Sequence, residues 1–212
     1  MIRIMTLIRI STVEEPFDTP GTVRSAVAFL SRAETMGFLG DEDIDHLNIA
    51  TVRDVVDAMA EAGLGSGPGA LLRIPDDEIS GGEIAAVLAE LEDILESSPA
   101  PDREWPTLDH LFGIQTLAGL LGVSPASVRR YLRGERATPD QIAARLHFLA
   151  MVVSDLSGAY NDFGIRRWFT RSRSVLHGAA PRELLAGDWD PDHPGPRKVR
   201  ALARALLGSP AT

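Results

Sequence analysis

The stretch "LAGLLGVSPASVRRYLRGERATP", residues 117–139, decides the fold of the second half of this chain. Ser124 is a preferred helix N-cap and Pro125 is favoured at the first helical position, so a helix is expected to begin there. Gly122 precedes them, where a tight turn between two helices needs a positive φ angle. The stretch therefore predicts two helices joined by a short turn.

The apolar spacing around this turn indicates how the two helices pack. Ala118 is small where a second helix would cross closely, and Val128 and Leu132 are four residues apart and point inward. The apolar stripe of the first helix consists of Ile114, Leu117, Leu121 and Val123. This pattern is typical of a helix-turn-helix, and it resembles the Xre-type helix-turn-helix, including the "YLRGER" exit toward a further helix.

The outward positions of the second helix predict a DNA-binding surface. Exposed arginines can bind phosphates or make bidentate contacts to guanine edges, while serine bonds to backbone or base edges and alanine contacts a thymine methyl group. Arg136, in the following turn, is expected to contact a phosphate. The other candidates are Ser124, Ala126, Ser127, Arg129, Arg130 and Arg133. Two competing interpretations are solvated surface arginines and a helical hairpin that only packs or binds protein.

The charge of the chain is unevenly distributed. The 212 residues carry a net charge of −9. Residues 1–100 contain 6 arginines and 19 acidic residues, whereas residues 101–212 contain 15 basic and 11 acidic residues. The predicted DNA-binding surface therefore lies in the basic half, and the local patch matters more for a polyanion than the net charge does.

No catalytic, metal or cofactor site is expected. The chain has no cysteine, which excludes disulfides, thiolate metal sites and a cysteine nucleophile. Asp188, Asp190 and Asp192 alternate like the start of a calcium loop, but His193 stands where glycine is needed. The five histidines form no pair at ligand spacing. The chain is accordingly predicted not to be an enzyme.

The predicted location is the cytoplasm. The opening "MIRIMTLIRI" lacks a small-residue cleavage site, and no apolar run approaches the roughly 20 residues that span a bilayer. This opening could form a short strand or a mobile tail.

The predicted domain order follows a change of composition at "ESSPAPDREWP", residues 96–106. The expected segments are an acidic helical domain over 1–97, a linker over 98–106, the helix-turn-helix region over 107–157 and a C-terminal region over 158–212. Strand signals are nearly absent, so the predicted fold class is all-α.

Three helices are expected in the first segment: Thr22 could cap the first, Thr51 starts the second and Ser80 precedes the third. Apolar residues recur at helical spacing after each of these, namely Val23, Val27 and Leu30; Val52, Val55, Val56 and Met59; and Ile84, Val87, Leu88, Leu91, Ile94 and Leu95.

The C-terminal region is expected to form a compact group of short helices. One ends near Thr170, the next is opened by Pro181, and a last amphipathic helix carries Val199, Leu202, Leu206 and Leu207. Its motif residues are Trp168, Phe169, Leu176, Gly178, Pro181, Leu184, Leu185 and Gly187. In this order they resemble the toxin-binding domain of Xre/MbcA/ParS-type antitoxins, and residues 108–207 carry the resemblance.

The resemblance implies an antitoxin that binds operator DNA, represses its own operon and covers the active site of a RES-type toxin, which consumes NAD. It implies a mainly structural role for Trp168, Leu176, Gly178, Pro181, Leu184 and Leu185. The expected partner-facing residues are Arg171, Arg173, His177, Arg197, Lys198 and Arg200.

A single helix-turn-helix makes few DNA contacts, so a homodimer on a two-fold operator is expected. Two alternatives to the antitoxin remain: a stand-alone transcription regulator with a sensing N-terminal domain, and a structural adaptor that never binds DNA. The acidic half could serve a protein partner or restrain DNA affinity.

Overall fold

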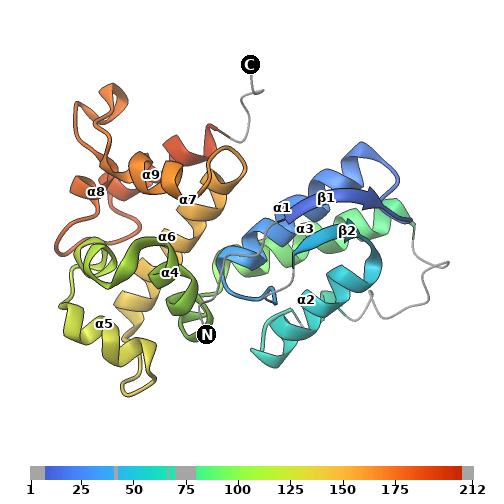
Figure 1. Cartoon of the computed structure of the whole chain (residues 1–212), viewed down its shortest axis with the longest axis horizontal. Coiled ribbons are helices and arrows are strands. Elements are labelled where there is room, and N and C mark those ends of the chain that lie inside the picture. The colour runs from blue at the N-terminus through green and yellow to red at the C-terminus, as the bar shows by residue number, and fades with distance from the viewer. Residues whose placement is uncertain (1–7, 41–42, 66, 70–79, 207–212) are drawn as a thin grey trace. The chain divides into compact units, whose positions relative to one another are not determined.

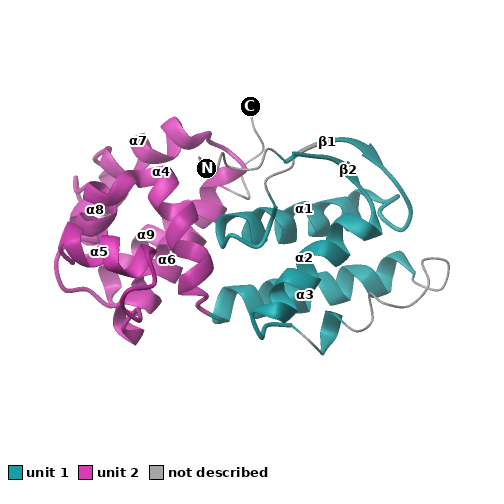
Figure 2. Ribbon diagram, turned by 60° about the horizontal axis from the view of Figure 1, so that its bottom comes forward, with its two compact units in different colours: residues 1–98 teal, residues 99–212 magenta. Residues whose placement is uncertain are grey.

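The computed structural model describes residues 8–40, 43–65, 67–69 and 80–206. The chain forms two compact units, residues 1–98 and 99–212, which Figure 2 shows in different colours. Helices dominate both units, as the sequence predicts. The all-α prediction nevertheless misses a short sheet in the first unit. Residues 1–7 of the opening stretch and Leu207 lie outside the described residues.

The sheet of the first unit has two parallel strands, β1 (Ile8–Val13) and β2 (Ile44–Leu47) (Figure 1). Ile8 pairs with Ile44 and Val13 with Leu47, and the N–H of Glu14 donates to the carbonyl of Leu47 at 3.0 Å. Isoleucine, threonine and valine favour extended backbone because their branched Cβ is crowded in a helix. The described end of the opening stretch, residues 8–10, is therefore the beginning of a strand that continues to Val13, and the first domain is not purely helical.

The helices of the first unit are α1 (Pro20–Thr35), α2 (Ile49–Glu61) and α3 (Gly81–Ser97). Ser80 caps α3, as predicted, whereas α1 is capped by Thr19 and α2 by Asn48. The predictions at Thr22 and Thr51 are wrong, because each residue lies three positions after the true cap and two positions after the first helical residue. Each occupies the third helical position, where its backbone N–H donates to the side chain of the true cap.

The core of the first unit consists of apolar helix faces. Figures 1 and 2 show α1 and α3 side by side. The predicted faces of α2 and α3 are buried, except that Ile94 is half-buried. On α1 the prediction is wrong for Val23 and Val27, which are half-buried, because the buried stripe runs through Ala26, Phe29, Leu30 and Ala33.

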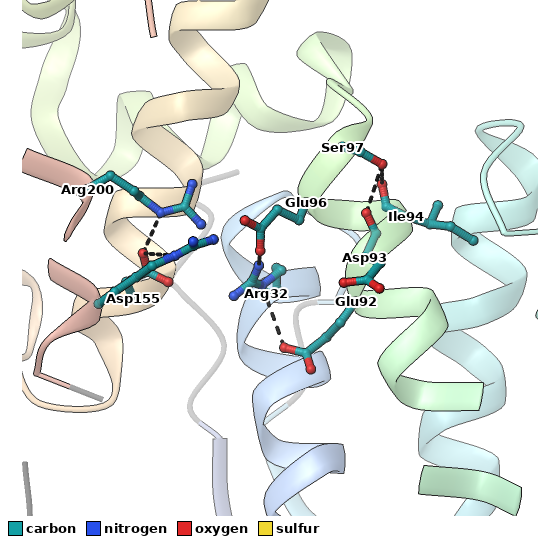
Figure 3. A network of polar contacts seen from close by, with 9 residues as sticks. Arg32, Glu92, Asp93, Ile94, Glu96, Ser97, Asp155 and Arg200 are labelled. Carbon is teal, nitrogen blue, oxygen red and sulfur yellow. Dashed lines mark hydrogen bonds and ion pairs between the residues drawn. The ribbon is translucent and has the colours of Figure 1, made fainter. Parts of the chain in front are cut away.

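An ion-pair cluster lies beside this core. Arg32 of α1 pairs with Glu92 and Glu96 of α3, and the Arg32 Nε to Glu92 Oε1 distance is 3.8 Å (Figure 3). Only 10% of the Arg32 side chain is exposed. The two carboxylates therefore compensate the burial of this guanidinium within the acidic unit.

The second unit begins with α4 (Pro101–Leu121), which is broken at Gly113, where φ is 71° and ψ is 154°. Residues 101–106, predicted to be linker, are thus the first turns of a helix. Pro101 stands at a position where proline favours a helix start, and Trp105 is 1% exposed. The apolar contacts of Trp105 outweigh the loop-like composition of the stretch.

The remaining helices are α5 (Pro125–Leu132), α6 (Asp140–Ser157), α7 (Asp162–Thr170), α8 (Pro181–Leu184) and α9 (Pro194–Arg204), with a 3-10 turn, η3 (Ser174–Leu176), after α7. Most of α6 is buried, and it contacts α4, α7 and α9. It is the central helix on which the second unit packs.

In the described part of the chain, no single helix combines the length and apolarity that a membrane span needs. Helices α6 and α7 reach both only when joined, and they meet at a bend of 118°.

Candidate nucleic-acid interface

The turn between α4 and α5 is built on Gly122. Its φ of 68° and ψ of 32° are left-handed, and the next residue, Val123, donates its N–H to the carbonyl of Ala118 at 3.0 Å. Glycine adopts this conformation without the steric cost of a Cβ. A Cβ at this position would also lie 2.0 Å from the carbonyl oxygen of Gly187. Glycine is required here for both reasons.

Helix α5 starts at a capped N-terminus, as predicted. The hydroxyl of Ser124 accepts the N–H of Ser127 at 3.1 Å, and the two serine hydroxyls are 3.0 Å apart. Pro125 occupies the first helical position. The two serines therefore define where the helix begins. Of the predicted DNA-binding residues at this end of α5, Ser124 and Ala126 are exposed and Ser127 is half-buried.

Replacing Ser124 by alanine should lower the free energy of unfolding of the second unit by about 1 kcal/mol, since an N–H at the start of α5 loses its acceptor. Glycine at the same position should cost only a few tenths of a kcal/mol. Denaturant midpoints of the two variants check this. A Ser124→Ala protein as stable as the parent would mean that the hydroxyl does not cap the helix.

The inner side of α5 packs on the first part of α4. Val128 is fully buried, as predicted, but Leu132 is half-buried. Tyr131, which the sequence pattern did not single out, is 7% exposed and stacks on Trp105 with 5.4 Å between ring centroids. The indole of Trp105 donates to the hydroxyl of Thr138 at 2.8 Å. Trp105 therefore holds the C-terminal end of α5 and the stretch that follows this helix.

The outer side of α5 carries the predicted arginines. Arg129, Arg130, Arg133 and Arg136 are all exposed. Within the described residues, the side chains of Arg129 and Arg130 have neither an ion pair nor a hydrogen bond. Arg133 forms an ion pair with Glu135, with 3.2 Å between Nη1 and Oε1. The Cζ atom of Arg136 lies 5.9 Å from the centroid of the Tyr131 ring.

The electrostatics of this surface differ from those of the whole chain. Residues 124–136 contain four arginines and one acidic residue, in a chain with a net charge of −9. Arg129 and Arg130 stand in the last turn of α5, where the helix dipole favours positive charge. The surface is a local cationic patch able to attract a polyanion.

The motif residues of the C-terminal region lie mostly in its core. Trp168, Leu176 and Leu185 are at most 4% exposed, Pro181 is buried and Leu184 is half-buried. Gly178 has a φ of 87° and forms the turn between η3 and α8. His177, just before it, is exposed and also has a positive φ of 57°.

Four of the six expected partner-facing residues are exposed: Arg171, His177, Arg197 and Lys198. The expectation of a freely exposed side chain is wrong for Arg173 and Arg200. Arg173 is half-buried over the ring of Trp168, 5.4 Å from its centroid. Arg200 is drawn inward by the buried carboxylate of Asp155, with 2.6 Å between its Nε and Oδ2 (Figure 3).

A buried pair that sequence reasoning missed joins α4 to α6. Glu104 Oε1 lies 2.6 Å from His147 Nδ1, and Glu104 Oε2 has no hydrogen-bond partner among the described residues. Burial raises the pKa of Glu104 above its ordinary value of 4.5, while the contact with His147 acts in the opposite direction. Only the helical spacing of position 104 with Trp105 and Leu108 could have indicated this burial.

The raised pKa predicts a pH effect on stability. The folded Glu104 holds its proton to higher pH than the unfolded chain does, so its ionisation destabilises the fold as pH rises from 4.5 through the raised value. Glu104→Gln removes this ionisation and keeps a polar group beside His147. The free energy of unfolding of the variant, minus that of the parent, should therefore increase over this range in denaturant titrations. A decrease would mean that the contact with His147 outweighs burial.

A scan against protein-family models, a search of curated proteins and a search of solved structures each gave no match. Among the described residues, no group of three or more histidine, aspartate or glutamate side chains is arranged to hold a metal ion.

Proposed function

We propose that this protein is an antitoxin that binds operator DNA through residues 107–157 and neutralises a RES-type, NAD-consuming toxin through residues 158–212. The observation that carries the DNA-binding part is the two-sided character of α5. Its inner side is buried through Val128 and Tyr131, while Arg129 and Arg130 on its outer side are exposed and unpaired.

The proposed reading unit is a helix-turn-helix formed by the second part of α4, the turn at Gly122 and α5. The major groove of B-DNA is about 12 Å wide and admits one α-helix. Arg129, Arg130 and Arg133 are proposed to contact guanine edges or phosphates, and Arg136 a phosphate. A homodimer would place two such helices about 34 Å apart on a two-fold operator.

The toxin-binding part rests on the antitoxin-like motif and on exposed apolar side chains. The described residues contain four exposed large hydrophobic side chains, and Tyr160, Phe163 and Val175 of the C-terminal region are three of them. Phe163 and Val175 are 65% and 63% exposed. Together with the exposed polar side chains of Arg171 and His177, they offer both apolar area and polar contacts to a protein partner.

The test has two arms. In the first, the protein is co-expressed with the adjacent open reading frame, and that frame is also expressed alone. Growth arrest by the neighbour alone, relief by co-expression and a stable complex support the antitoxin. An adjacent frame that is harmless and does not bind overturns the toxin part.

In the second arm, binding to the DNA upstream of the protein's own gene is measured between 50 and 200 mM salt. Affinity should fall steeply, since each neutralised phosphate releases counterions. Affinity that is weak and equal for upstream and unrelated DNA overturns operator binding.

A stand-alone regulator is the second candidate function, and the observation that favours it is the separate compact unit of residues 1–98. This candidate predicts operator binding without any toxic neighbour. Ligand-dependent DNA affinity in the full chain, lost when residues 1–98 are removed, would support it.

A further inference from the structure

The chain between α8 and α9 covers the end of α4. The indole N–H of Trp189 donates to the carbonyl of Leu120 at 2.8 Å, and this contact is buried. Trp189 is 4% exposed. Its ring packs edge to face on the ring of Phe148 in α6, with 5.3 Å between the ring centroids. A residue 69 positions away thus satisfies a carbonyl in the last turn of the helix.

Arg145 of α6 also contacts both the end of α4 and the chain between α8 and α9. Its Nη1 donates to the carbonyl of Leu121 at 3.0 Å, its Nε donates to the carbonyl of Trp189 at 2.5 Å, and its Nη2 pairs with the carboxylate of Asp188. Only 3% of the Arg145 side chain is exposed. One buried guanidinium therefore joins the end of α4 to the chain at residues 187–189.

The turn at Gly122 is enclosed by these contacts. Trp189 donates to the carbonyl of Leu120 and Arg145 donates to the carbonyl of Leu121. The carbonyl oxygen of Gly187 lies so close to Gly122 that a Cβ there would be 2.0 Å from it. Because α5 begins only three residues after Gly122, a change in this packing is expected to alter the direction in which α5 leaves the turn.

We infer that residues 187–189 form a coupling segment that sets the position of α5, with Arg145 and Trp189 as positioning residues. Through this segment, a perturbation on the C-terminal surface reaches the helix proposed to read DNA. The DNA-affinity part of the inference rests on the proposed function; the positioning part does not. The outer end of the segment is accessible, because the Asp188 side chain is 88% exposed while its partner Arg145 is buried.

The first experiment compares Trp189→Phe with Trp168→Phe by hydrogen exchange. Both tryptophans are buried in the second unit, but the Trp168 indole N–H has no acceptor among the described residues. Trp189→Phe should raise exchange at the Val123 and Val128 amides on the order of tenfold, as expected for a lost buried hydrogen bond. Trp168→Phe should leave these amides within about twofold of the parent.

The second experiment asks whether a surface change reaches the turn, and it compares Asp188→Asn with Asp192→Asn. Both carboxylates are paired with arginine and more than four-fifths exposed, but Asp192 pairs with the exposed Arg197. Asp188→Asn should raise exchange at the Val123 and Val128 amides, and it should weaken DNA binding by about the factor by which exchange rises. Asp192→Asn should change neither the exchange nor the DNA affinity. Arg145→Lys, which keeps the charge but loses the forked donors, should act like Asp188→Asn.

The outcomes separate this inference from the proposed function. The positioning role is overturned, whatever the DNA affinity, if Trp189→Phe exchanges like Trp168→Phe and Asp188→Asn exchanges like Asp192→Asn at the Val123 and Val128 amides. Raised exchange with unchanged DNA affinity overturns the coupling to DNA. A parent protein that binds no DNA overturns the proposed function, and the exchange comparison still decides whether residues 187–189 position α5.

Discussion

Gly122→Ala should be the most destabilising single substitution in the turn, lowering the free energy of unfolding of the second unit by about 3 kcal/mol. A left-handed conformation costs a residue with a Cβ roughly 1–2 kcal/mol. The added methyl group must in addition displace the backbone carbonyl of Gly187, which would lie 2.0 Å away. That carbonyl belongs to the segment fixed by Arg145 and Trp189, so it has little freedom to move.

Two other glycines of the same unit separate these causes. Gly134 has a φ of 65° with open space around it, so Gly134→Ala should show the conformational cost alone, about 1–2 kcal/mol. Gly119 lies within α4 and also faces open space. Gly119→Ala should stabilise the protein by about 0.5–1 kcal/mol, because alanine loses less entropy in a helix. Denaturant midpoints give all three values, and an equal loss at positions 122 and 134 would refute the clash with Gly187.

The double substitution Arg129→Ala, Arg130→Ala should abolish most DNA binding if α5 reads the operator. An arginine that contacts a base is worth about 1–3 kcal/mol, so the pair together should weaken binding by roughly 30-fold to 10⁴-fold. The fold should be unaffected, since both side chains are exposed and have no partner among the described residues.

The matched control is Arg182→Ala, which removes an exposed arginine of α8 in the same unit. Fluorescence anisotropy on the DNA upstream of the gene, at fixed salt, gives the affinities. Each single variant also reveals the kind of contact: loss of a phosphate contact reduces the salt slope by about one, whereas loss of a base contact relaxes sequence preference. A double variant that binds like the control would remove α5 from the proposed interface.

The placement of α5 was predictable because its signals are local. Ser124 caps the helix through the N–H of Ser127, Gly122 takes the left-handed conformation, and Val128 turns inward. Each of these depends on residues within a few positions in the chain, so spacing and residue type suffice. The predicted exposure of the arginines on α5 followed from the same periodicity.

Predictions failed where distant residues compete for a side chain. Arg200 looked like a surface charge on an amphipathic helix, but Asp155 of α6 holds it. The stretch before Pro106 looked like a linker, yet Trp105 is buried against Tyr131. The first half contains a parallel sheet because β1 pairs with β2, although α1 separates the two strands in the sequence. No local signal encodes a pairing between strands so far apart in the chain.

The sequence by itself determined the helix starts at Ser80 and Ser124, the turn at Gly122 and the cationic outer face of α5, since these depend on backbone sterics and helical period. Only the tertiary structure decided which carbonyls Arg145 and Trp189 bind and where the carboxylate of Glu104 is buried. Those contacts join residues more than 20 positions apart. Their partners are set by how the helices pack around α6, which a one-dimensional pattern does not contain.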